Sequence, residues 1–232
     1  MTDVPFDLTK LKLDRKQPLR DQVYGLVREL ILAGAIAPGE VIDEKLIAAQ
    51  LNMSRTPVRE AVKKLSDEHL VDVVAQSGTR ASKIDRHEVE QAFLIRRALE
   101  TESAAQAAAR MTDRHADILS DILLRHSRAI ERKQFAEAIS HDDQFHRYIA
   151  EISDLPRLWK AIEISKAQLD RCRHLMLPRG SEGEITLEHH REIIRTLNSK
   201  DAERARKAMA EHLELSYNNA IKAIDSGEIG SG

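Results

Sequence analysis

Residues 52–65 have the sequence NMSRTPVREAVKKL, which predicts a helix with one apolar face. The spacing i, i+3, i+4 and i+7 brings four apolar side chains to one side of that helix. These four are Val58, Ala61, Val62 and Leu65. Thr56 is the expected N-cap and Pro57 the expected first helical residue, where the N–H that proline lacks would have no partner.

The N-terminal end of this helix concentrates hydrogen-bond donors from Ser54, Arg55, Thr56 and Arg59. Guanidinium groups, hydroxyls and free backbone N–H groups are donors that phosphates and base edges accept. By itself, the stretch fits an ordinary surface helix with a basic first turn equally well. The flanking sequence favours the nucleic-acid interpretation.

A helix is predicted from Pro18 to Gly34, and Asp43 is expected to cap a second, short helix before residues 52–65. Two short helices joined by about four residues, the second with a basic N-terminal end, predict a helix-turn-helix. The β-branched residues of 71–74 and the residues 79–81 predict a hairpin with Gly78 near its tip. A hairpin at this place makes a winged helix, and Gly78 would let the wing backbone approach a groove closely.

The composition of the chain excludes several classes of protein. Its 36 Lys and Arg and 38 Asp and Glu give a net charge of −2, so any basic surface must be local. Cys172 is the only cysteine, which excludes an intrachain disulfide and a cysteine-based metal site. No apolar run approaches the ~20 residues of a membrane span, and the start lacks a signal-peptide pattern. We therefore expect a cytoplasmic protein without membrane contact.

The predicted fold class is mainly α: an N-terminal winged helix-turn-helix followed by an all-α antiparallel bundle. The expected domains are 1–83, with residues 1–17 as an N-terminal arm, and 84–232. Six helices are predicted in the second domain, at about 86–109, 113–132, 134–152, 155–177, 184–198 and 200–225. Metals and small ligands commonly bind inside such bundles.

Four residues of the bundle form a candidate metal site. Asp142 and His146 stand four residues apart, so they share one face of a helix. His190 and His212 lie on apolar faces, where an imidazole needs a polar partner. Taken singly, each histidine fits a hydrogen-bonded core residue, and Asp142 with His146 fits an exposed ion pair. Together the four predict ligands of a divalent transition metal, with His189 as the alternative to His190.

The N-terminal domain resembles the GntR family of bacterial transcription regulators. The resemblance rests on the Pro38-Gly39 turn, the block at 47–61 and the glycine-containing wing. It implies a homodimer that binds operator double-stranded DNA. The implied DNA contacts are Lys45, Ser54, Arg55, Thr56, Arg59 and Gly78. Lys45 departs from the family pattern, because members often have arginine at this place.

The bundle resembles the ligand-sensing domain of the fatty-acid-regulator branch of that family, called the FCD type. The matching features are the Arg-x-x-Leu-Glu segment at 96–100, the Asp-x-x-Phe-His segment at 142–146, the segment at 188–191 and the late His212. The segment at 188–191 contains one histidine more than the family pattern. The resemblance implies zinc or nickel as cofactor, and a small carboxylate effector that completes the metal coordination. Arg96, with Arg171 or Arg173, is expected to bind that carboxylate.

These features predict a metabolite-responsive, DNA-binding transcription regulator, with repression as the commoner family pattern. The alternative is a metal-dependent hydrolase that uses the His/Asp site to activate water. A DNA-binding architectural protein without an effector is the third hypothesis. No further Glu, His or Ser has a spacing that marks a general base or nucleophile. An enzyme also gives no reason for a winged helix, so the prediction is that the protein is not an enzyme.

Overall fold

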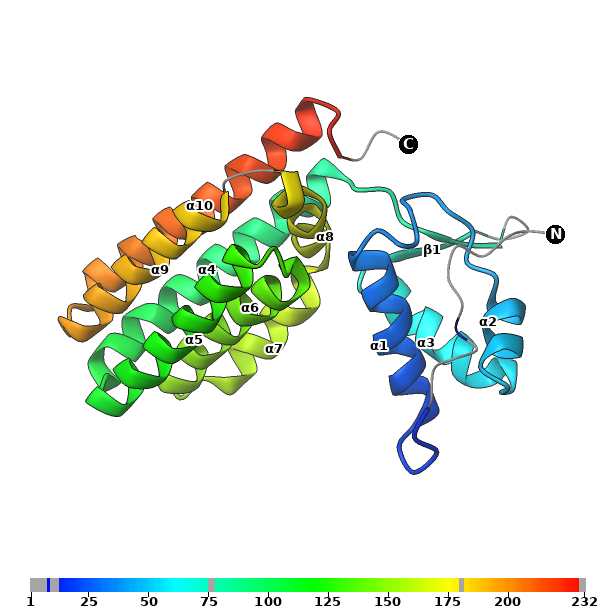
Figure 1. Ribbon diagram of the computed structural model, residues 1–232, viewed down its shortest axis with the longest axis horizontal. Coiled ribbons are helices and arrows are strands. Elements are labelled where there is room, and N and C mark those ends of the chain that lie inside the picture. Colours follow the sequence, from blue (N-terminus) through cyan, green and yellow to red (C-terminus); the bar gives the residue numbers. More distant parts are fainter. Residues whose placement is uncertain (1–7, 9–12, 75–77, 180–181, 230–232) are drawn as a thin grey trace. The chain divides into compact units, whose positions relative to one another are not determined.

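The computed structural model describes residues 8, 13–74, 78–179 and 182–229 (Figure 1). The chain divides into two compact units between Ile84 and Asp85. Each unit has its own core and is described separately. Within the described residues, no helix is both long and apolar enough to cross a bilayer.

The first unit is a winged helix. It consists of α1 (Leu19–Leu32), α2 (Glu44–Gln50), α3 (Arg55–Asp67) and an antiparallel hairpin of β1 (Val71–Val74) and β2 (Gly78–Ala81). The Asp43 carboxylate caps α2 by accepting from the backbone N–H groups of Lys45 and Leu46, as predicted. The apolar face of α3 is fully buried, and α3 packs against α1. The predicted helix-turn-helix with a wing is confirmed.

The predicted start of α3 is wrong by two residues. Ser54, with an extended backbone, is the N-cap, so the helix begins at Arg55 and Pro57 is its third residue. Proline is tolerated there because the first N–H groups of a helix have no acceptor within it. Thr56 therefore lies inside the first turn, where it does not cap the helix.

The second unit is an all-α bundle that starts with α4 (Arg86–Arg110), capped by the Asp85 carboxylate. The helices that follow are α5 (Asp113–Glu131), α6 (Phe135–Ile152), α7 (Pro156–Ser165), α8 (Ala167–Met176), α9 (Glu182–Asn198) and α10 (Ala202–Asp225), with a 3-10 turn, η1 (Leu177–Arg179), after α8. In Figure 1, α4 lies along α10 and α6, and α5 lies along α6 and α9. Their shared core includes Phe145, Ile149, Ile193 and Met209. The mainly α fold class is confirmed.

The helix predicted at 155–177 is two helices, so the described part of this unit has seven α-helices and not six. The separation falls at Lys166. The Ser165 hydroxyl donates to the carbonyls of Ala161 and Ile162, at 3.1 and 3.0 Å, and such side-chain bonds compete with the helical ladder. The Lys166 ammonium is buried between Asp143 and Asp170, at 2.7 and 2.6 Å. These contacts accompany the break, one of them reaching to α6, and apolar periodicity does not encode them.

Candidate functional site

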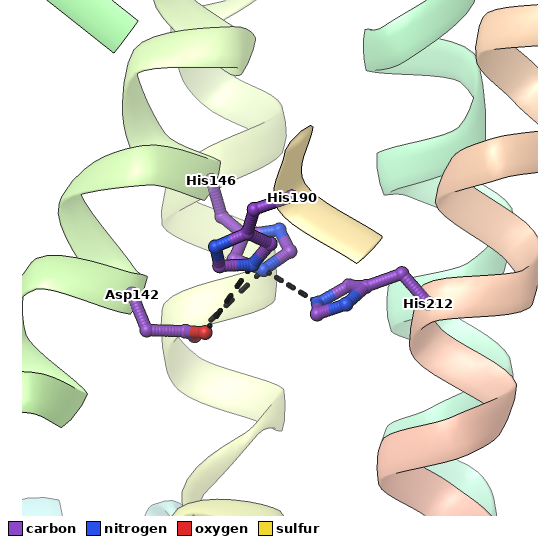
Figure 2. Close-up of side chains that lie close together, drawn as sticks. All are labelled: Asp142, His146, His190 and His212. Carbon is purple, nitrogen blue, oxygen red and sulfur yellow. Dashed lines mark hydrogen bonds and ion pairs between the residues drawn. The ribbon is translucent and has the colours of Figure 1, made fainter. Parts of the chain in front are cut away.

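The four predicted metal ligands meet in the core of the bundle. Asp142 and His146 come from α6, His190 from α9 and His212 from α10 (Figure 2). One ligand atom from each lies within 4.8 Å of the others, and all four residues are buried. His189, the alternative to His190, is half-buried and outside this cluster. Asp142 and His146, four residues apart on α6, are therefore two of the four residues of the cluster.

Two of the separations between ligand atoms suit a single ion, and His146 Nε2 lies somewhat farther, 3.7 Å, from Asp142 Oδ2. His146 Nε2 lies 3.1 Å from His212 Nε2, and His190 Nε2 lies 3.4 Å from Asp142 Oδ1. Bonds of about 2.1 Å to one ion place neighbouring ligand atoms roughly 3.0–3.4 Å apart. Among the described residues, His190 Nε2 makes no hydrogen bond despite the approach of Asp142. A buried ring nitrogen without a hydrogen bond is costly, and coordination would relieve that cost.

Electrostatics favour the protonation states that a metal requires. Burial holds the pKa values of His190 and His212 well below the usual range, so both imidazoles are neutral. Burial alone would raise the pKa of Asp142, but the Arg173 guanidinium, 2.5 Å from Asp142 Oδ2, outweighs it and holds the pKa well below normal. Neutral imidazoles and an ionised carboxylate are the forms that bind metal.

Glu100 of α4 lies behind the cluster. Its Oε2 is 2.5 Å from His146 Nδ1, and its Oε1 accepts a hydrogen bond of 2.6 Å from Arg96 Nε. Burial opposes ionisation of Glu100, but Arg96 and His146 together hold its pKa below the usual range. A carboxylate at Nδ1 favours the tautomer whose Nε2 lone pair faces the other ligands.

A small cavity of about 50 Å³ lies beside the cluster. Asp142 and His212 line it together with Arg96, Arg173 and His126. Arg173 Nη2 lies 2.5 Å from Asp142 Oδ2. Arg171 is buried, but it is not among the residues that line this cavity. Two residues along a helix correspond to a turn of about 200°, so Arg171 and Arg173 leave α8 on nearly opposite sides.

His126 of α5 is a cavity-lining residue that the sequence interpretation missed. It is buried, and its Nδ1 has no hydrogen-bond partner within the described part of the chain. Burial lowers its pKa to about 4. The available signal was its position three and four residues after Leu123 and Ile122, on the buried face of α5.

The buried histidines predict a stability that depends on pH. The folded pKa of His126 is about 4, whereas an unfolded histidine titrates near 6.5. Below pH ~6.5 the unfolded chain therefore binds the proton first, and the stability present above that pH is lost as the pH falls towards 4. The gap corresponds to roughly 3 kcal/mol for this residue, and His190 and His212 act in the same direction.

Urea unfolding of chelator-treated protein across this pH range measures the effect. His126→Gln is expected to flatten the curve, since the replacement does not titrate. The same slope in the variant and the wild-type protein would contradict the assignment to His126.

The first unit has a groove of about 790 Å³ that α2, α3 and the wing line. Four of the predicted DNA contacts line it: Lys45, Arg55, Arg59 and Gly78. Arg55 and Arg59 extend into solvent, with 45% and 65% of their side chains exposed. Ser54 and Thr56 are exposed at the start of α3 but do not line this groove. Gly78 has a φ of +86°, a conformation that favours glycine.

A winged helix that presents arginines in a groove, joined to a helical unit with a buried polar centre, is the architecture of a DNA-binding transcription regulator. The family model of the gntR bacterial regulatory proteins matches residues 19–80. The FCD domain model matches residues 91–215. The chain belongs to the gntR family, in the group with an FCD domain.

Individual relatives agree with this membership. The chain is 34% identical to the HTH-type transcriptional repressor RspR of Escherichia coli strain K12, over 88% of this chain and 89% of RspR. It is 30% identical to the probable D-xylose utilization operon transcriptional repressor of Paenarthrobacter nicotinovorans, over 89% and 90% of the two chains. The solved structure of E. coli McbR/YncC shares the fold, with a TM-score of 0.77 at 24% identity over 89% of this chain and 98% of that one. These relatives are regulators and not enzymes.

Proposed function

We propose that this regulator is a repressor whose operator affinity changes when a small carboxylate binds beside a divalent metal in the helical unit. One observation carries the proposal: three histidines and an aspartate converge beside a cavity that two arginines also line. The names of two relatives, RspR and the probable D-xylose operon protein, support repression.

Asp142, His146, His190 and His212 would hold the metal. Three imidazoles and one carboxylate form a ligand set that zinc accepts, and imidazole also suits nickel. The bound ion would supply a Lewis-acidic position for a carboxylate oxygen. Glu100 would fix the His146 ring through Nδ1, which lies 2.5 Å from its Oε2.

Arg96 and Arg173 would bind the carboxylate from the cavity wall. Arg96 uses Nε for its bond to Glu100, and the two Nη groups of a guanidinium offer the geometry for a second, bidentate contact. Arg173 contacts Asp142, so a ligand that draws Arg173 towards itself would also affect a metal ligand. Ser216 and Asn219 add polar groups to the same wall. The small volume and the two arginines therefore favour a small acid.

The response would require two states of a homodimer that hold the two winged helices at different separations. An effector can shift such an equilibrium only by the difference between its affinities for the two states. Repression is relieved if the carboxylate prefers the separation that does not match the operator half-sites.

Metal analysis and mass spectrometry of the purified protein would identify the ion and any small molecule bound with it. An operator selected by the protein from a random duplex library then serves as the probe. A matching carboxylate is expected to weaken binding at least about fivefold, the lower end of common allosteric couplings, while its amide analogue has no effect. Fluorescence anisotropy measures both, and liquid chromatography follows the compound itself.

The protein should not convert the added small carboxylate into another compound during this experiment. Turnover that chelation abolishes would indicate the metal-dependent hydrolase instead. Operator binding that ignores every carboxylate and survives metal removal would indicate an architectural protein without an effector.

A further inference from the structure

We infer that Glu44 is a specificity-determining residue of the DNA-binding groove, although its charge is the same as that of DNA. Glu44 is the first residue of α2 and lines the groove beside Arg55 and Arg59. We infer that it positions Arg59 for base contacts and weakens the attraction of the groove for phosphates in general. This inference rests on the proposed role of the groove in operator binding.

Side chains from two other parts of the winged helix, the wing and α3, converge on the Glu44 carboxylate. From the wing, Thr79 Oγ1 donates a hydrogen bond of 2.9 Å to its Oε1. From α3, Arg59 Nε lies 3.5 Å from its Oε2, and Arg55 Nη2 lies 4.0 Å from the same oxygen. Glu44 is 18% exposed, whereas Arg59 is 65% exposed. The carboxylate is therefore held at the base of the groove, and the arginine head extends outward from it.

The atom through which Arg59 makes this contact matters. A guanidinium reads guanine by pairing two of its N–H groups with O6 and N7. A carboxylate at Nε does not use the edge formed by Nη1 and Nη2. The contact can thus limit the rotation of the Arg59 side chain before DNA arrives, and such preorganisation lowers the entropy lost on binding.

The charge of Glu44 acts differently on the two kinds of DNA complex. Phosphate attraction supplies most of the affinity for arbitrary sequences, and a carboxylate in the groove opposes it. At the operator the same carboxylate orients Arg59 for its base contact. That contact offsets part of the repulsion between the carboxylate and the phosphates. Specificity often depends on such repulsion of the wrong partner. Asp43 also lines the groove, but its carboxylate caps α2.

The decisive variant is Glu44→Gln, which keeps the side-chain shape and an oxygen that can accept from Thr79. Glu60→Gln is the matched control, because Glu60 is an exposed acid of α3 that lines a different hollow, with Arg20. Anisotropy titrations at several salt concentrations would compare the selected operator with a shuffled duplex. Thermal unfolding would verify that every variant is folded.

Glu44→Gln is expected to bind the shuffled duplex more tightly and the operator no more tightly, so that the ratio of the two affinities falls at least about fivefold, the lower end for one base pair. Glu60→Gln should change both affinities alike. In an Arg59→Ala background, Glu44→Gln should no longer alter base preference, since coupled residues are not additive. If Glu44 only stabilised the fold of the groove, the effect of Glu44→Gln on base preference would not depend on Arg59.

An unchanged ratio in Glu44→Gln would overturn the inference, as would equal effects with and without Arg59. Selection of no consensus by the wild-type protein would overturn the proposed operator-binding groove itself, and the role of Glu44 with it. A wild-type consensus with an unchanged ratio would overturn only the role of Glu44.

Discussion

Replacement of His190 by alanine is expected to remove nearly all metal from the purified protein. His190 is fully buried, and its Nε2 faces Asp142 within the four-residue cluster. Loss of a direct ligand should weaken binding by more than the 10–100-fold that is typical for residues behind the ligands. A metal held at a hundred times its dissociation constant contributes about 2.7 kcal/mol, so the melting temperature should fall as well.

Elemental analysis and thermal unfolding measure these two effects. His189→Ala is the matched control, because His189 is the adjacent residue of α9 and lies outside the cluster. It should retain the metal and the melting temperature of the wild-type protein. Full metal occupancy in both His190→Ala and His212→Ala would rule out the proposed ligand set.

Arg55→Ala is expected to cost about 1–3 kcal/mol of operator affinity and to relax base preference at one position of each half-site. Arg55 is the first residue of α3, lines the groove and has 45% of its side chain exposed. Loss of a residue that contacted only phosphate would weaken binding to all sequences alike and would lower the salt dependence of binding.

Lys64→Ala is the control for Arg55→Ala, because it removes the same charge from the same helix. The Lys64 ammonium lies over the Tyr24 ring, 3.6 Å from its centre, and Lys64 does not line the groove. Anisotropy titrations with the selected operator and its single-base variants compare the two. An unchanged footprint and affinity in Arg55→Ala would contradict its assignment as a base contact.

The winged helix and the bundle could be predicted because their signals are local. The apolar spacing of α3 and the Asp43 cap each lie within one or two helical turns. The cluster of Asp142, His146, His190 and His212 could also be predicted, since Asp142 and His146 share a face and His190 and His212 stand on apolar seams. Burial of such groups requires partners, and a shared ion would be a partner common to all four.

The remaining differences depend on contacts between distant segments. The break at Lys166 reflects the burial of its ammonium against Asp143, a residue of another helix. The choice of Arg173 over Arg171 depends on which side of α8 faces the cavity, and no spacing within α8 indicates this. His126 stands on an apolar stripe as His190 and His212 do, but none of the motifs that singled out the proposed ligands contains it.

The uninterrupted length of α4 has a mechanical consequence. Glu100, which contacts both His146 and Arg96, lies fourteen residues from Arg86, where the helix begins directly after the winged helix. At 1.5 Å per residue this is a stiff lever of about 21 Å. A tilt of only about 5° around Glu100 would move the far end by about 2 Å. A rotation of that size that starts at a buried side chain would thus reach Arg86, the first residue of α4, with no break in the helix between them.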